Sequence, residues 1–132
     1  MGSIFTKIIN GTVPSFKIYE DEHCYAFLDI RPIHGGHTLV VPKLEVDHFT
    51  EVPEPYYSAV FQAAQKIGKA IREATGAPRV GGAVVGFEVP HFHYHLVPLW
   101  SPSDLNFSHA KAASPAELKK MQEAILTVLN RT

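Results

Sequence analysis

The stretch His91-Phe92-His93-Tyr94-His95-Leu96-Val97-Pro98 decides how this chain is organised. Histidine alternates with aromatic residues, and side chains along a β-strand alternate between its two faces. The pattern predicts a strand over residues 91–98, with the three histidines on one face and Phe92, Tyr94 and Leu96 on the other. Because the second face is apolar, we expect it to meet the core and the histidine face to line a pocket or face solvent.

Further strands and helices are predicted on both sides of this stretch. Runs of β-branched and aromatic residues bounded by turn residues indicate strands over residues 16–19, 24–28, 37–41 and 80–86. Pro55 and Gly76 bound a long helix over residues 55–74, and Ser114 begins a last helix. We expect one α+β domain over residues 1–132, an antiparallel sheet of about five strands with one long central helix and a C-terminal helix.

The composition excludes several classes of protein. A chain of 132 residues with 45% hydrophobic and 19% charged residues suits one folded domain better than a disordered segment. The net charge of −1 excludes a large basic surface for nucleic acid. No apolar run reaches the roughly 18 residues of a membrane span, and the lone Cys24 cannot form an internal disulfide. We expect a cytoplasmic protein that binds neither nucleic acid nor a membrane.

The histidine face suits two chemistries, beside a third interpretation in which these histidines have no role. Two imidazoles of a His-x-His pair could bind one metal ion. The third histidine lies about 13 Å from the first along a strand, too far to join them. Alternatively, a neutral imidazole attacks phosphorus while its neighbours hold the phosphate oxygens and protonate the leaving group. The spacing favours phosphoryl or nucleotidyl transfer without excluding a metal site.

Three sequence blocks resemble the histidine-triad (HIT) family, in its Hint-like nucleotide-binding branch. The family motif, His-x-His-x-His followed by two apolar residues, matches residues 91–97. An earlier block resembles the ribose-binding segment and the strand after it, over residues 26–32 and 37–43. The N-terminal block is Ile4-Phe5-Thr6-Lys7-Ile8-Ile9 with Val13-Pro14. The resemblance implies a HIT-like fold and hydrolysis at the α-phosphate of a nucleotide.

The resemblance also implies a role for each of four histidines. His93, the middle histidine, is expected to be the nucleophile and to form a transient nucleotidyl-histidine. His95 is expected to bind the phosphate, as is His37 from the earlier strand. His91 is expected to orient His93 through its side chain or its backbone carbonyl.

The nucleotide-binding residues are implied in the same way. Asp29 is expected to accept hydrogen bonds from both ribose hydroxyls, which suits a carboxylate. An apolar slot for the base is expected from Ile4, Phe5, Ile8 and Ile30. Phe87 and Glu88, in the segment before the triad, complete the predicted nucleotide-binding set.

The resulting expectation is a hydrolase that acts on a nucleotide phosphoramidate or a related nucleoside monophosphate derivative. The alternatives are a hydrolase of dinucleoside polyphosphates and a nucleotide-binding protein with little turnover. We expect a purine nucleotide as substrate and no cofactor. A homodimer is expected as well, because relatives pair through the long helix and an adjacent strand, and that helix has no second layer to bury against in so thin a domain.

Three departures from the family pattern affect these expectations. Many members carry a Cys-x-x-Cys pair that holds zinc, whereas this chain has Ser3 and Thr6 there, so no structural zinc and no metal ligands are expected. An asparagine that helps to hold the phosphate is replaced by Val80, and a glutamine by Phe87. Because two polar phosphate contacts are then absent, the departures bear on rate and substrate more than on fold.

Overall fold

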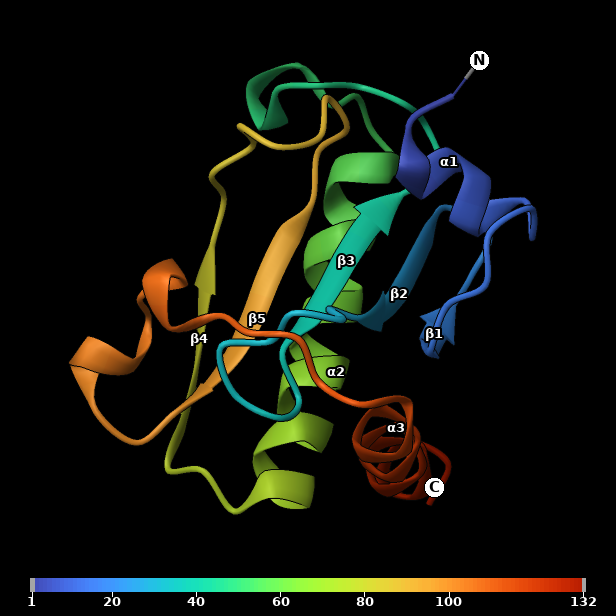
Figure 1. The fold of residues 1–132 in the computed structure, drawn as a ribbon. Coiled ribbons are helices and arrows are strands. Elements are labelled where there is room, and N and C mark those ends of the chain that lie inside the picture. Colours follow the sequence, from blue (N-terminus) through green and yellow to red (C-terminus); the bar gives the residue numbers. More distant parts are fainter. Residues whose placement is uncertain (1, 132) are drawn as a thin grey trace.

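A five-stranded antiparallel sheet with the strand order β1-β2-β3-β5-β4 forms the centre of the computed structural model (Figure 1). The model describes residues 2–131, so the two end residues of the predicted domain, Met1 and Thr132, lie outside the described part. The predicted α+β class is confirmed. The strands and the three α-helices of the described part are β1 (Lys17–Glu20), β2 (Cys24–Leu28), β3 (Thr38–Pro42), β4 (Arg79–Ala83), β5 (Tyr94–Leu99), α1 (Ile4–Ile9), α2 (Tyr56–Thr75) and α3 (Pro115–Leu129).

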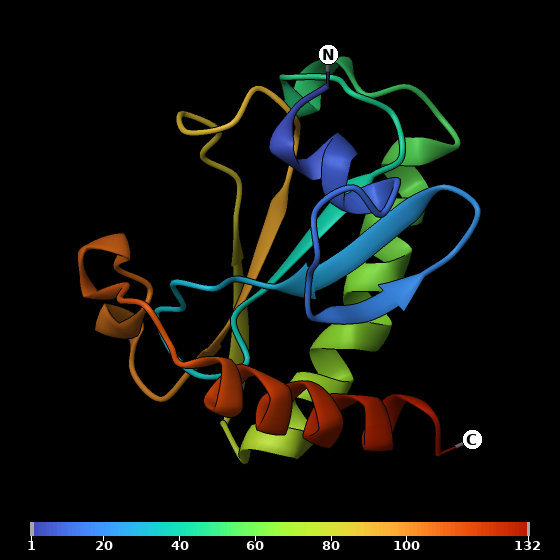
Figure 2. The same cartoon turned by 45° about the vertical axis from the view of Figure 1, so that its right-hand side comes forward.

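Helix α2 covers one face of the sheet and builds the main core there (Figures 1 and 2). Val60, Ile67 and Ile71 are fully buried along its inner side, at the spacing of an amphipathic helix. Helix α3 lies across the lower end of α2 in Figure 2 and adds two buried side chains, Leu118 and Ile125, to this core. The expectation that α2 has no second layer to bury against is therefore wrong, because α3 supplies one.

Helix α1 packs on the opposite face of the sheet. Its Phe5 joins a second buried cluster with Tyr25, Phe27, Leu39 and Val41. Leu39 pairs with His95 in the β3–β5 ladder. Since directly paired residues share a face, His95 lies on the same face as α1.

The predicted strand over residues 91–98 begins later than expected, at Tyr94. The Phe92 N–H donates to the carbonyl of Val46 at 2.7 Å, and the His91 N–H donates to Val89 at 2.8 Å. These bonds join the segment to the connection after β3 and to its own preceding loop, so it forms no ladder with β3. The alternation of side chains nevertheless persists, because Phe92 is buried in the α2 core.

The predicted strand over residues 80–86 also ends early, at Ala83. Gly86 has a φ of +83°, a conformation that a side chain would strain. Residues 84–93 form the loop between β4 and β5. No helix within the described residues is long and apolar enough to cross a membrane.

Candidate active site

A cavity of about 540 Å³ opens on the histidine side of the sheet. Its lining comes from α1, the loop between β2 and β3, β3 itself, the loop between β4 and β5, β5 and the segment after it. The lining residues are Phe5, Asp29, Arg31, His37, Leu39, Val85, Gly86, Phe87, Glu88, Val89, His93, His95, Phe107 and Ala110. A larger cavity, of about 660 Å³, lies between the loop before β3 and α3, and neither His93 nor His95 lines it. The histidine chemistry therefore belongs to the smaller cavity.

The proton positions on His91 and His93 follow from their carbonyl partners. His91 Nε2 lies 2.9 Å from the carbonyl oxygen of Pro42, and His93 Nδ1 lies 2.8 Å from the carbonyl oxygen of His91. A carbonyl oxygen only accepts, so each of these ring nitrogens carries a proton. In neutral His93 the other nitrogen, Nε2, consequently keeps its lone pair.

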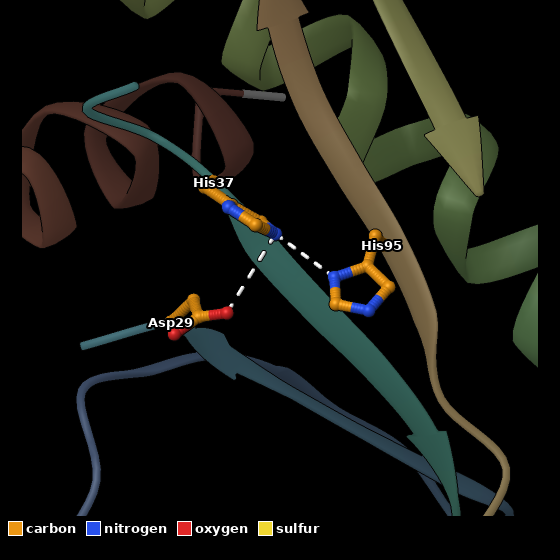
Figure 3. A group of neighbouring side chains, drawn as sticks. All are labelled: Asp29, His37 and His95. Atoms are coloured by element: carbon orange, nitrogen blue, oxygen red, sulfur yellow. Dashed lines mark hydrogen bonds and ion pairs between the residues drawn. The ribbon is translucent and has the colours of Figure 1, made fainter. Parts of the chain in front are cut away.

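His37 and His95, which both line the cavity, belong to a second chain of hydrogen bonds (Figure 3). The Ile33 N–H donates to His37 Nδ1 at 3.0 Å, which leaves the proton on His37 Nε2. That nitrogen lies 2.9 Å from His95 Nδ1 and 3.7 Å from a carboxylate oxygen of Asp29. His95 Nδ1 therefore accepts, and the remaining N–H of His95 is its Nε2–H.

Burial keeps these rings neutral. Desolvation lowers the pKa of His37 to about 4 and that of His95 to about 3. It also lowers the pKa of His91. Desolvation also raises the pKa of the Asp29 carboxyl. The Arg31 N–H donates to this carboxylate at 2.9 Å and lowers the pKa, but by less than desolvation raises it. The hydrogen bonds between neutral rings thus hold at neutral pH.

These bonds disfavour metal binding in the present arrangement. Within the described residues, one group of three potential ligands has atoms within 4.8 Å of one another, namely Asp29, His37 and His95. A metal ligand must offer a lone pair. The proton on His37 Nε2 removes one lone pair, and the hydrogen bond from that proton occupies the lone pair of His95 Nδ1.

The neutral buried histidines predict that the protein loses stability in acid. A histidine of the unfolded chain has a pKa of about 6.5, whereas His37 and His95 titrate near pH 4 and 3 in the folded chain. Between these values the unfolded chain binds protons that the folded chain does not. The free energy of unfolding therefore falls as the pH falls from about 6.5, by up to about 1.4 kcal/mol per pH unit for each such histidine.

Urea unfolding at pH 7.5, 6 and 5 measures this slope. His37→Gln can keep one acceptor and one donor but cannot titrate, so we expect a shallower slope than in the native chain. The matched control is His48→Gln, at an exposed histidine, which should keep the native slope. Equal slopes for His37→Gln and the native chain would contradict the assignment of neutral His37.

The predicted site residues are partly brought together. His37, His93 and His95 line the cavity, and so do Phe5, Asp29, Phe87 and Glu88 from the nucleotide-binding set. The other members of that set and the first histidine lie outside the lining: Ile4, Ile8, Ile30 and His91. Ile4 and Ile30 are exposed, at 43% and 61%, and Ile8 packs on the α1 cluster.

Val80 does not face the cavity. Its side chain packs against the α2 core and lies beside Gly68 of that helix. The positions of β4 on the histidine face are Gly81 and Ala83, which pairs with His95. The expectation that Val80 stands where a phosphate contact would be is therefore corrected, because an asparagine side chain at this position would point toward α2.

Four further residues line the cavity that were not predicted from the sequence: Arg31, Leu39, Phe107 and Ala110. The centroids of the Phe107 and His95 rings are 4.8 Å apart, and the rings meet edge to face. Phe107 reaches the cavity because the Lys111 N–H donates to the Pro32 carbonyl and the Ala113 N–H to the Ile30 carbonyl, which holds this stretch against the loop after β2. The only signal available in the sequence was an aromatic residue in a polar loop.

Comparison with known proteins bears directly on this histidine site. Residues 10–101, which include the whole triad, match the HIT domain. The chain belongs to the HIT family. This HIT protein is 37% identical over 131 residues to Protein hit of Bacillus subtilis. The match covers 92% of this chain and 90% of that protein. The resemblance seen in the sequence is thereby confirmed.

Two further relatives extend the comparison. The Saccharomyces cerevisiae protein named adenosine 5'-monophosphoramidase HNT1 is 36% identical over 96 residues, which are 72% of this chain and 61% of that protein. The Hit-like protein involved in cell-cycle regulation from Bartonella henselae has a solved structure with a TM-score of 0.85 and 28% identity. The match covers 96% of this chain and 95% of that one.

Proposed function

We propose that this HIT protein hydrolyses the bond between the α-phosphate of a purine nucleotide and an amine leaving group. The observation that carries the proposal is the state of His93. Its Nδ1–H is held by a backbone carbonyl at 2.8 Å, so Nε2 keeps the lone pair, and the ring lines the cavity. The name of the yeast relative, a monophosphoramidase, supports a phosphoramidate as the substrate.

The proposed reaction has two displacements at phosphorus. His93 Nε2 attacks the α-phosphorus, the phosphorus–nitrogen bond of the substrate breaks, and the amine leaves with the electron pair and takes up a proton from solvent. A water molecule then attacks the same phosphorus, loses a proton to solvent and breaks the bond to Nε2, which takes back its electron pair. These steps give the nucleoside monophosphate and restore neutral His93. The His91 carbonyl, which accepts from Nδ1–H, stabilises the positive charge on the imidazole of the intermediate.

The other residues of the cavity bind and orient the substrate in this proposal. His95 donates its Nε2–H to a phosphate oxygen. Both ring nitrogens of His37 are used within the protein, so we assign His37 to holding His95 rather than to touching the phosphate. Asp29 accepts from the ribose hydroxyls, and Phe5, which lines the cavity, contacts the base. The expected contributions of Ile4, Ile8 and Ile30 to a base slot stay a prediction.

The direct test is incubation with adenosine 5'-phosphoramidate and, separately, with a dinucleoside polyphosphate, each with and without a chelator. We expect the 5'-nucleotide from the phosphoramidate in both the presence and the absence of chelator. Loss of activity in chelator would assign the chemistry to a metal ion. Tight nucleotide binding without product would instead make this a nucleotide-binding protein with little turnover.

A homodimer is expected on the evidence of the sheet edge. Strand β4 ends the sheet and pairs with β5 alone among the described strands, and an open strand edge is available for pairing. Tyr57, on the neighbouring helix α2, is exposed. Sedimentation at micromolar concentration should show a species of twice the 14.6 kDa chain mass, and a 14.6 kDa species alone would contradict this prediction. The cytoplasmic location likewise stays a prediction.

A further inference from the structure

A group of hydrogen bonds outside the cavity joins the start of α1 to the first histidine. Ser3 Oγ lies 2.8 Å from His91 Nδ1 and also accepts the Thr6 N–H at 3.1 Å. One carboxylate oxygen of Glu45 accepts both the Ser3 N–H and the Thr6 hydroxyl, each at 2.7 Å. None of these side chains lines the cavity, and the proposed function leaves Ser3, Thr6 and Glu45 without a role.

The direction of the bond between Ser3 and His91 is fixed. His91 Nε2 donates to the Pro42 carbonyl, so in the neutral ring Nδ1 has a lone pair and no proton. The Ser3 hydroxyl must therefore donate to it. His91 is 1% exposed, so a removed hydroxyl leaves a buried acceptor that water reaches poorly.

The position of His91 governs that of the nucleophile. Its backbone carbonyl accepts the Nδ1–H of His93 at 2.8 Å. Phe5 of α1 lies edge-on to both rings, with centroid distances of 5.7 Å to His91 and 4.9 Å to His93. A shift of α1 or of the His91 ring would therefore displace the carbonyl that sets the tautomer of His93.

We propose that Ser3 and Glu45 are positioning residues for the triad. Ser3 holds the His91 ring, and hence its carbonyl, where the carbonyl orients His93. Glu45 holds Ser3 and Thr6 against the connection that follows β3. The inference rests on the proposed role of His93. A helix cap alone does not account for the arrangement, because capping of α1 needs the bond to the Thr6 N–H and not the bond to His91.

The test compares Ser3→Gly with Ser114→Gly. Ser114 caps α3 as Ser3 caps α1, through its Oγ and the Glu117 N–H at 3.1 Å, and it touches no histidine of the site. Glycine is tolerated at a helix cap, so both variants should fold. We expect kcat for the phosphoramidate to fall about tenfold in Ser3→Gly, with KM within about twofold, and both constants to stay native in Ser114→Gly.

Nitrogen-15 NMR of the imidazoles reports which ring nitrogen carries the proton. A loss of stability alone would leave the tautomers of His91 and His93 unchanged. In the native chain and Ser114→Gly, His91 should report a proton on Nε2 and His93 a proton on Nδ1. In Ser3→Gly both signals should shift toward mixed tautomers, and Ser3→Thr, which restores a hydroxyl, should recover the native spectrum and kcat.

Two variants at position 45 test the second residue. Glu45→Gln keeps an oxygen that accepts both bonds and should retain native kcat, whereas Glu45→Ala should lower kcat as Ser3→Gly does. Native tautomers and native kcat in both Ser3→Gly and Glu45→Ala would overturn the proposal. If the native protein shows no hydrolysis, the proposed function fails, and the NMR comparison alone decides whether Ser3 and Glu45 position the histidines.

Discussion

Replacing His93 with alanine should reduce turnover of a nucleotide phosphoramidate by about 10⁴-fold or more, with nucleotide affinity close to native. The side chain supplies the lone pair that forms the covalent intermediate. The other two histidines that line the cavity have no free ring lone pair to take its place. His95 Nδ1 and His37 Nδ1 already accept hydrogen bonds within the protein. Binding should persist because Asp29 and Phe5, which line the cavity, remain.

Rapid quench followed by mass spectrometry checks the chemistry of this step. The native protein should carry one added nucleotidyl group during turnover, and His93→Ala should carry none. His109→Ala is the matched control, because His109 is exposed and does not line the cavity, and it should keep native turnover. Substantial hydrolysis by a clean sample of His93→Ala would remove His93 from the proposed mechanism.

The architecture was largely predictable from local signals. Pro55 and Gly76 flank a helix observed over Tyr56–Thr75, and Gly76 adopts the left-handed conformation that ends it, with a φ of +75°. The histidine face was predicted from the alternation of side chains along a strand. The alternation continues over residues 91–93, although these residues are not part of β5. The start of β5 at Tyr94 was not predictable from the sequence. It depends on the hydrogen bond from the Phe92 N–H to the carbonyl of Val46, which is far away in sequence.

The site was less predictable than the fold, because it depends on contacts between residues that are far apart in the sequence. His37 and His95 meet because β3 and β5 are neighbours in the sheet, and the family resemblance already placed both at the phosphate. Phe107 and Arg31 reach the cavity through the packing of two loops against each other, which has no sequence period. The orientation of Val80 needed the exact register of β4 on β5, and that register was not available from the sequence.

Phe87 stands apart from the other cavity residues because its side chain is 93% exposed. Phe87 therefore fills no part of the core beneath the sheet. It lies in the loop over the cavity that also contains Gly86 and Glu88. A change at this position should therefore act on substrate rather than on folding.

Phe87→Gln should raise kcat/KM for a phosphoramidate by about ten- to a hundredfold. The amide N–H of glutamine can donate to a phosphate oxygen, which phenylalanine cannot, and a hydrogen bond to a charged group is worth about 1.5–3 kcal/mol. We also propose that the Phe87 ring narrows the side of the cavity that takes the leaving group, so the increase should be greater for a dinucleoside polyphosphate. Steady-state kinetics on both substrates measure the two effects.

Phe87→Leu separates the hydrogen bond from the width of the cavity. Leucine removes the ring but donates nothing, so it should improve the dinucleoside polyphosphate alone, whereas Phe87→Gln should improve both substrates. Because the side chain is exposed, unfolding midpoints should match the native chain in both variants. If Phe87→Gln lowers kcat/KM for both substrates in the folded protein, the ring contacts the substrate, and its removal costs more than the new hydrogen bond contributes.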